Sequence, residues 1–222
     1  MLWQNNSGRN VKIAKRQQSI AELGALYGSR KREIRTRLTE FRRVPPSDYF
    51  YELVYCILTP QSSARNAATV VQLLRDYNFE RREIDPTPVL RQKESYIRFH
   101  GTKAKRLQEI RKEFPTILQQ LTDGSPSEKQ RRWLVENVKG LGYKEASHFL
   151  RNIGHRNLAI LDRHILKNLL RFGVIDVLPK NLTPKMYLEI ENRFRLFAEK
   201  VGIPVDELDL LFWSMETGEV LK

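Results

Sequence analysis

The chain has 222 residues, 41% of them hydrophobic, which is enough for one large domain or for two smaller lobes. Its formal net charge of +13 exceeds what solubility requires and favours a polyanionic partner, with DNA, RNA and membrane surfaces all open on charge alone. The sequence contains no run of about 18 apolar residues, so it predicts no membrane-spanning helix. The single cysteine, Cys56, excludes a disulfide framework and any cysteine-ligated zinc or iron–sulfur site, and its apolar neighbours predict that it is buried.

Apolar residues at three- and four-residue steps, punctuated by proline and glycine, predict helices along most of the chain. Residues 1–16 are basic and polar without the apolar core of a signal peptide, so we expect a flexible leader before one unit at 17–222. Pro115 is expected to kink or break its helix. The pattern predicts an all-α chain of about nine to eleven helices. The helical segments lie near 20–41, 47–58, 62–74, 102–114, 125–138, 144–154, 162–173, 183–201 and 208–218.

A turn with two glycines separates two of these helices, at residues 138–143. Gly140 and Gly142 permit left-handed backbone angles and leave the outer surface free of side chains. The backbone amides at the start of the next helix would then suit a phosphate, and they would position DNA without reading its sequence. Lys139 and Lys144 place two positive charges beside this expected phosphate site. Taken alone, the glycine pattern is explained equally well by a plain helix–helix turn.

The motif KGLGYK (139–144), followed by LDRH (161–164), resembles the helix-hairpin-helix DNA glycosylase superfamily. The resemblance is strongest to the second, archaeal-type class of 8-oxoguanine DNA glycosylase/lyase and covers roughly residues 35–222. It implies two helical lobes with a DNA-binding cleft between them. The hairpin (about 131–154) would lie at that cleft, with a catalytic aspartate loop after it (about 155–164). The matching segments are GYKEASHFLRNIG (142–154), AILDRHIL (159–166), YLEIEN (187–192) and TGEVLK (217–222), and more loosely YCILTPQSSA (55–64) and TKAKR (102–106).

Two residues carry the chemistry that this resemblance implies. Lys144 matches the Schiff-base lysine of the bifunctional members, and Asp162 matches their catalytic aspartate. A lysine attacks carbon only as the neutral amine, and neutralising an unperturbed lysine at pH 7 costs about 4.6 kcal/mol. Burial, the helix N-terminus and Lys139 favour the neutral form, whereas Asp162 opposes it unless it accepts the proton. The alternatives are a solvated lysine on phosphate and an aspartate that only caps its helix.

The resemblance also implies a pocket for a nucleotide flipped out of the duplex. The damaged base carries N7–H where guanine has an acceptor, so the terminal carboxylate of Lys222 is a candidate acceptor that distinguishes the two. Trp213 is a candidate for stacking on the base, although a core tryptophan explains it equally well. Phe99 is a weaker candidate of the same kind.

Further contacts to DNA are expected from the hairpin and from a second turn. Lys139, Gly140 and Gly142 are candidates for phosphate binding. Gln61 and Ser62 follow a helix and are candidates for phosphate contacts or for the gap left by the flipped base, while a simple helix cap also explains Ser62. No metal site, organic cofactor or iron–sulfur cluster is expected, and a monovalent cation at the hairpin is a further expectation.

The combined prediction is a bifunctional enzyme that excises 8-oxoguanine and then cleaves the abasic strand. Its partner would be double-stranded DNA with an oxidised purine, and the protein would be a monomer in the cytoplasm without a membrane contact. One alternative is a glycosylase for another oxidised base. The other is a non-catalytic helix-hairpin-helix protein that binds DNA structure, which would bind in a salt-sensitive manner without covalent chemistry.

Overall fold

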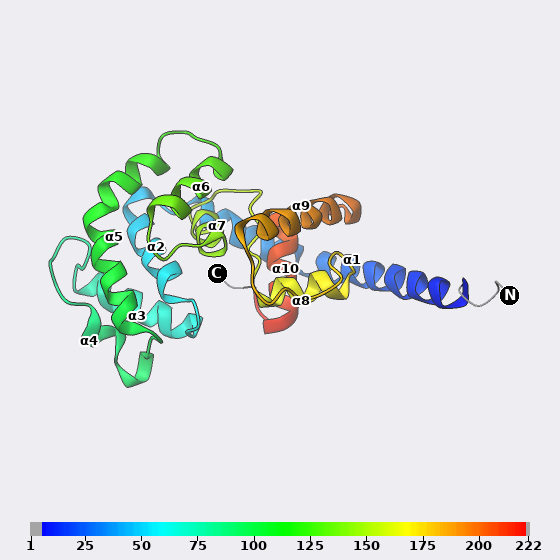
Figure 1. The fold of residues 1–222 in the computed structure, drawn as a ribbon, viewed down its shortest axis with the longest axis horizontal. Helices are drawn as coiled ribbons and strands as arrows, with labels where there is room; N and C mark the ends of the chain where they lie inside the picture. The colour runs from blue at the N-terminus through cyan, green and yellow to red at the C-terminus, as the bar shows by residue number, and fades with distance from the viewer. Residues whose placement is uncertain (1–5, 221–222) are drawn as a thin grey trace. The chain divides into compact units, whose positions relative to one another are not determined.

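The computed structural model describes residues 6–220, with side chains from residue 20 onward. Within that range it contains ten α-helices, two short 3-10 helices (η1 and η2) and no strand, which confirms the all-α prediction (Figure 1). No helix among these residues combines the length and the apolar stretch needed to cross a bilayer. The helices are α1 (Asn6–Arg42), η1 (Pro46–Asp48), α2 (Tyr49–Leu58), α3 (Ala64–Asp76), α4 (Thr87–Leu90), η2 (Lys93–Ser95), α5 (His100–Leu121), α6 (Ser127–Asn137), α7 (Tyr143–Asn152), α8 (Arg163–Arg171), α9 (Pro184–Val201) and α10 (Val205–Thr217).

The chain divides into two compact units. One unit consists of residues 1–39 and 159–222, and the other of residues 40–158. Helix α1 begins at Asn6 and therefore includes part of the expected leader, whose flexibility stays a prediction. The DNA-binding cleft expected between two lobes also stays a prediction.

Helix α2 is the centre of the unit at residues 40–158. It packs against α3, α5 and α7, so its residues from Phe50 to Leu58 are all buried (Figure 1). Cys56 is fully buried, as predicted. The buried carboxylate of Glu52 accepts a hydrogen bond from Asn152 Nδ2 of α7 (3.2 Å), which satisfies two polar groups inside the core. Helix α7, the second helix of the predicted hairpin, is thereby attached to the apolar core around α2.

Helix α5 continues through Pro115, so the expected break does not occur. Proline removes one backbone hydrogen bond within a helix. Phe114 and Ile117 on either side of it, and Leu121 one turn further, are buried in the same core as α2. Tertiary packing of this apolar face outweighs the local cost of the proline.

Aromatic rings form the core of the second unit, between α8, α9 and α10. Phe212 of α10 stacks on Phe172 at the end of α8 (5.4 Å between ring centroids) and on Phe194 of α9 (5.6 Å). Helix α1 is attached to α10 by Tyr27, whose hydroxyl donates to the buried carboxylate of Glu207. Burial, together with this carboxylate, raises the pKa of Tyr27 to about 12, so the hydroxyl keeps its proton at physiological pH.

Candidate active site

The hairpin consists of α6, a turn at residues 138–142 and α7. Gly140 has φ +96°, where a side chain is strained, and a Cβ there would lie 2.7 Å from Arg106 Cδ. Gly142 has φ −89° and ψ −179°, an extended conformation open to any residue. The expectation of left-handed angles is therefore right for Gly140 and wrong for Gly142. Gly142 is still confined, because a Cβ there would lie 3.1 Å from the carboxylate of Glu145.

Gly140→Ala is expected to weaken DNA binding roughly tenfold, because a Cβ forces Arg106 away from the turn whose amides are predicted to bind phosphate. The left-handed backbone adds about 1–2 kcal/mol of destabilisation. Gly124→Ala is the matched control, since Gly124 also has a positive φ (+76°) but no atom within 4 Å of its Cβ position. Fluorescence anisotropy on duplex DNA and thermal melting measure the two effects. Equal DNA affinity of the two variants would contradict the assignment of the turn to phosphate binding.

Lys144 lies in the first turn of α7, with its side chain 32% exposed and its Nζ 3.0 Å from Glu145 Oε1. The other oxygen of Glu145 accepts the Gly142 amide (3.3 Å). One carboxylate therefore holds both the amine and the first amide of the hairpin helix. Glu145 was not among the predicted site residues, although a glutamate three residues after a helix cap is a known capping signal.

Lys139 takes a different position on the same turn. Its side chain is 80% exposed, and its Nζ lies 3.5 Å from Glu109 Oε1 of α5. An ion pair this exposed contributes little to stability and leaves the ammonium accessible. The arrangement suits a phosphate contact, which stays a prediction.

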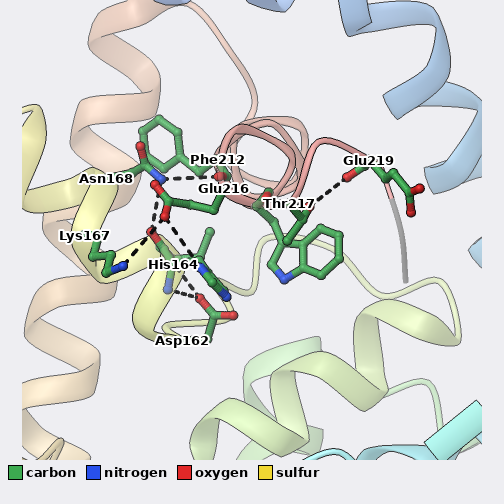
Figure 2. A network of polar contacts seen from close by, with 10 residues as sticks. Asp162, His164, Lys167, Asn168, Phe212, Glu216, Thr217 and Glu219 are labelled. Atoms are coloured by element: carbon green, nitrogen blue, oxygen red, sulfur yellow. Dashed lines mark hydrogen bonds and ion pairs between the residues drawn. The ribbon is translucent and has the colours of Figure 1, made fainter. Parts of the chain in front are cut away.

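Asp162 is the N-cap of α8, as its sequence position predicts. Its Oδ1 accepts the backbone amides of His164 (2.8 Å) and Ile165 (2.9 Å), as Figure 2 shows. Both of these bonds use the same oxygen, so Oδ2 lies outside the cap. Capping and a role in chemistry are compatible because they use different oxygens of one carboxylate.

Buried side chains from α9 and α10 hold the extended segment 159–161 that leads into Asp162. Glu191 accepts the first amide of this segment and Asp209 accepts the second, both at 2.9 Å. The Tyr187 hydroxyl donates to the first carbonyl (2.6 Å) and accepts the third amide (3.2 Å). All three side chains are at most 2% exposed. The backbone before Asp162 is thus fixed by polar groups of the core.

Tyr187→Phe is expected to lower the free energy of unfolding by about 1–3 kcal/mol, because a buried carbonyl and a buried amide of segment 159–161 lose their partner. We expect base excision to fall as well, since this segment positions Asp162. Tyr77→Phe is the control, because Tyr77 is 47% exposed. Denaturant unfolding and single-turnover excision are the measurements. A variant as stable and active as the control would show that the hydroxyl is not needed there.

The end of α10 meets α8 beside Asp162 (Figure 2). Glu216 Oε2 lies 3.7 Å from His164 Nδ1 and 3.8 Å from Lys167 Nζ. One helical turn earlier, Asn168 Nδ2 donates to the carbonyl of Phe212 (3.2 Å). These contacts hold α10 against the helix that Asp162 caps.

The residues expected to surround the flipped base come from three segments of the chain. Trp213 on α10 is only partly buried, so its side chain is not enclosed in the core. Phe99 is 51% exposed at φ +59°, with the Arg98 guanidinium 5.1 Å from its ring centre. Lys222 lies outside the described residues, so its role stays a prediction.

The turn between α2 and α3 presents Gln61 outward, at φ +57°. Ser62 beside it has its hydroxyl occupied inside the fold, where it accepts the Arg98 amide (3.0 Å) and the Lys103 ammonium (3.2 Å). The predicted cap on α3 comes instead from Ser63, which accepts the Asn66 amide (3.4 Å). Ser62 thus serves as a link between two loops, while a phosphate contact from Gln61 stays a prediction.

Among residues 6–220, no cluster of three or more histidine, cysteine, aspartate or glutamate side chains is placed to hold a metal ion. The Lys144 amine belongs to one unit and the Asp162 carboxylate to the other, and their catalytic roles stay predictions. An amine at a helix N-terminus and a carboxylate with one unused oxygen are the groups needed for nucleophilic displacement and proton transfer.

These features define an all-helical DNA-repair glycosylase of the helix-hairpin-helix class. The sequence model of the 8-oxoguanine DNA glycosylase family matches residues 34–203, and the chain belongs to that family.

Relatives of known name and structure agree with this assignment. The 8-oxoguanine DNA glycosylase/AP lyase of Fusobacterium nucleatum is 42% identical and spans 94% of this chain and all of the relative. The enzyme of that name from Korarchaeum cryptofilum is 41% identical over 91% of this chain and 97% of the relative. The crystal structure of Methanocaldococcus jannaschii 8-oxoguanine DNA glycosylase superposes with a TM-score of 0.83, at 36% identity, over 93% of this chain and 97% of that one. The same enzyme in complex with a 15-mer DNA containing 8-oxoguanine gives a TM-score of 0.83, at 35% identity, over 92% of this chain and 100% of that one.

Proposed function

We propose that this protein removes 8-oxoguanine from DNA and then cleaves the abasic strand by β-elimination. The observation that carries the proposal is Lys144, an amine at the N-terminus of the hairpin helix in a chain of this family. Relatives that are 41–42% identical over nearly the whole chain are named for both activities. The solved relative with 8-oxoguanine DNA supports DNA as the substrate.

The reaction begins with extrusion of the damaged nucleotide, because a base inside the duplex is beyond the reach of a lysine on a helix. The Lys144 amine attacks C1′, the bond from C1′ to the base breaks, and the base leaves with its electron pair. Asp162 accepts a proton from the amine and stabilises cationic character at the sugar. The sugar ring then opens: the C1′–O4′ bond breaks, O4′ takes the proton that Asp162 had accepted, and C1′ is left joined to Lys144 as a protonated Schiff base. The Schiff base acidifies the C2′ proton, and loss of that proton breaks the bond from C3′ to the phosphate oxygen. These reaction steps require the Lys144 amine and the Asp162 carboxylate to meet around the flipped nucleotide.

Several finer features belong to the same proposal. Trp213 and Phe99 would stack on the flipped base, and the terminal carboxylate of Lys222 would accept its N7–H. Lys139, the hairpin amides and Gln61 would contact the DNA backbone or the gap. The enzyme would act as a cytoplasmic monomer on double-stranded DNA without a resident cofactor, with a monovalent cation at the hairpin as the one ion proposed.

Borohydride reduction on a panel of duplexes tests the proposal. We expect a covalent protein–DNA adduct with 8-oxoguanine duplex, little adduct with an oxidised pyrimidine, and none with undamaged DNA. Adduct formation mainly on the pyrimidine lesion would identify a glycosylase for another base. Salt-sensitive binding without any adduct would identify a non-catalytic DNA-binding protein. A denaturing gel measures the adducts, and fluorescence anisotropy at increasing salt concentration measures binding without an adduct.

A further inference from the structure

Lys103 is a buried lysine on a face that is otherwise apolar. It is 3% exposed and lies at helical spacing with Leu107 and Ile110 of α5, both buried in the core. A buried ammonium is costly unless each of its protons has an acceptor. A lysine at such a position therefore needs a specific structural or functional reason.

The acceptors of Lys103 lie at the end of α2 and in the turn between α2 and α3. Its Nζ donates to the carbonyl oxygens of Leu58 (2.7 Å) and Pro60 (2.7 Å) and to Ser62 Oγ (3.2 Å). The three protons of the ammonium are thus fully used. This contact fixes the turn that carries Gln61, a non-glycine residue with φ +57°.

Ser62 extends this contact to a second loop, since its Oγ also accepts the Arg98 amide (3.0 Å). The next residue, Phe99, is a further non-glycine residue in the left-handed region, with φ +59°. A left-handed backbone in a non-glycine residue costs energy and persists only where the surroundings enforce it. One ammonium and one hydroxyl therefore join the two strained turns, each of which carries an exposed side chain.

Two positive charges, Arg106 of the same helix and Lys144 of the hairpin, lie near enough to Lys103 to act on its ammonium. Burial lowers the pKa of Lys103 to about 8, and the positive charges of Arg106 and Lys144 act in the same direction. Arg106, one turn further along α5, lies against Gly140. The first turns of α5 thus contact the hairpin on one side and the α2–α3 turn on the other.

We propose that Lys103 is a positioning residue for base extrusion. Through the Leu58–Ser62 turn and the Arg98 amide, it holds Gln61 and Phe99 in the paired conformation that occupies the gap in the duplex and receives the flipped base. This assignment rests on the proposed function, which gives Gln61 and Phe99 their roles at the gap and at the flipped base. The contacts that hold these two residues do not depend on the proposed function. Excision of a base needs this pair, whereas cleavage of a pre-formed abasic site, which has no base to extrude, does not.

Lys103→Met tests the proposal, because it keeps the length of the side chain and removes the ammonium. We expect single-turnover release of 8-oxoguanine to fall at least tenfold, while borohydride trapping on a pre-formed abasic site stays within about threefold of wild type. Ser62→Ala keeps the two carbonyl contacts of Lys103 and removes the link to Arg98. Ser62→Ala should lower the release of 8-oxoguanine by about threefold to tenfold and leave trapping on the abasic site unchanged. This variant tests the proposal if Lys103→Met does not fold. Lys112→Met, on an exposed position of the same helix, is the matched control.

Equal loss on both substrates, or no loss on either, would overturn the proposal, because a purely structural lysine gives no split between them. Amide hydrogen exchange provides a readout that does not depend on activity. The Arg98 amide should exchange at least tenfold faster in both variants than in wild type, and unchanged protection would also overturn the proposal. If wild type itself forms no adduct with either substrate, the proposed function fails, and hydrogen exchange still decides whether Lys103 holds these loops.

Discussion

Lys144→Gln is expected to abolish covalent trapping on 8-oxoguanine duplex and to lower strand cleavage by at least about a thousandfold. Glutamine is one atom shorter than lysine and can still form hydrogen bonds, but it has no nucleophilic amine. The partner of Lys144 in the resting protein, Glu145, still accepts the Gly142 amide, so the start of α7 should remain intact. Borohydride trapping on a denaturing gel and single-turnover cleavage measure the effect.

Lys112→Gln is the matched control for this experiment, because Lys112 is an exposed lysine of the same unit on α5. It should trap DNA as well as wild type. DNA binding of Lys144→Gln should stay within a few-fold of wild type, since one cation among many is lost. An adduct that persists in Lys144→Gln would show that another amine attacks the sugar.

Asp162→Asn is expected to lower turnover by about two to four orders of magnitude while DNA binding is retained. Asparagine is as good an N-cap as aspartate, so the bonds to the amides of His164 and Ile165 should persist and the melting temperature should change by only a few degrees. The variant loses the charge and the proton-accepting ability of the carboxylate. Excision kinetics, fluorescence anisotropy and thermal melting separate these effects.

Asp176→Asn provides the control, because Asp176 is exposed in the same unit. It should match wild type in all three measurements. Turnover near the wild-type level in Asp162→Asn would remove Asp162 from the chemistry and leave it as a helix cap. A large loss of stability would instead show that the cap depends on the charge.

The candidate site could be predicted where its signal is local. Asp162 was predicted as a cap because a cap is a matter of one residue and the next three amides. Gly142 was misjudged, since whether a glycine is needed for its φ or for its small size depends on a neighbour, here Glu145. Lys103 was not singled out, because the carbonyls that accept its protons lie more than 40 residues away along the chain.

By itself, the sequence determined the helical class, the ends of several helices and the position of the hairpin, while the roles of Lys144 and Asp162, implied by the family resemblance, stay predictions. The three determined features follow from periodicity, caps or short motifs, which involve neighbours within a few residues. Only the tertiary structure decided that α5 runs through Pro115, that Glu191, Asp209 and Tyr187 hold segment 159–161, and that Ser62 serves an internal link. The physical reason is that a buried polar group must be matched by a partner, and that partner is supplied by segments distant in the chain.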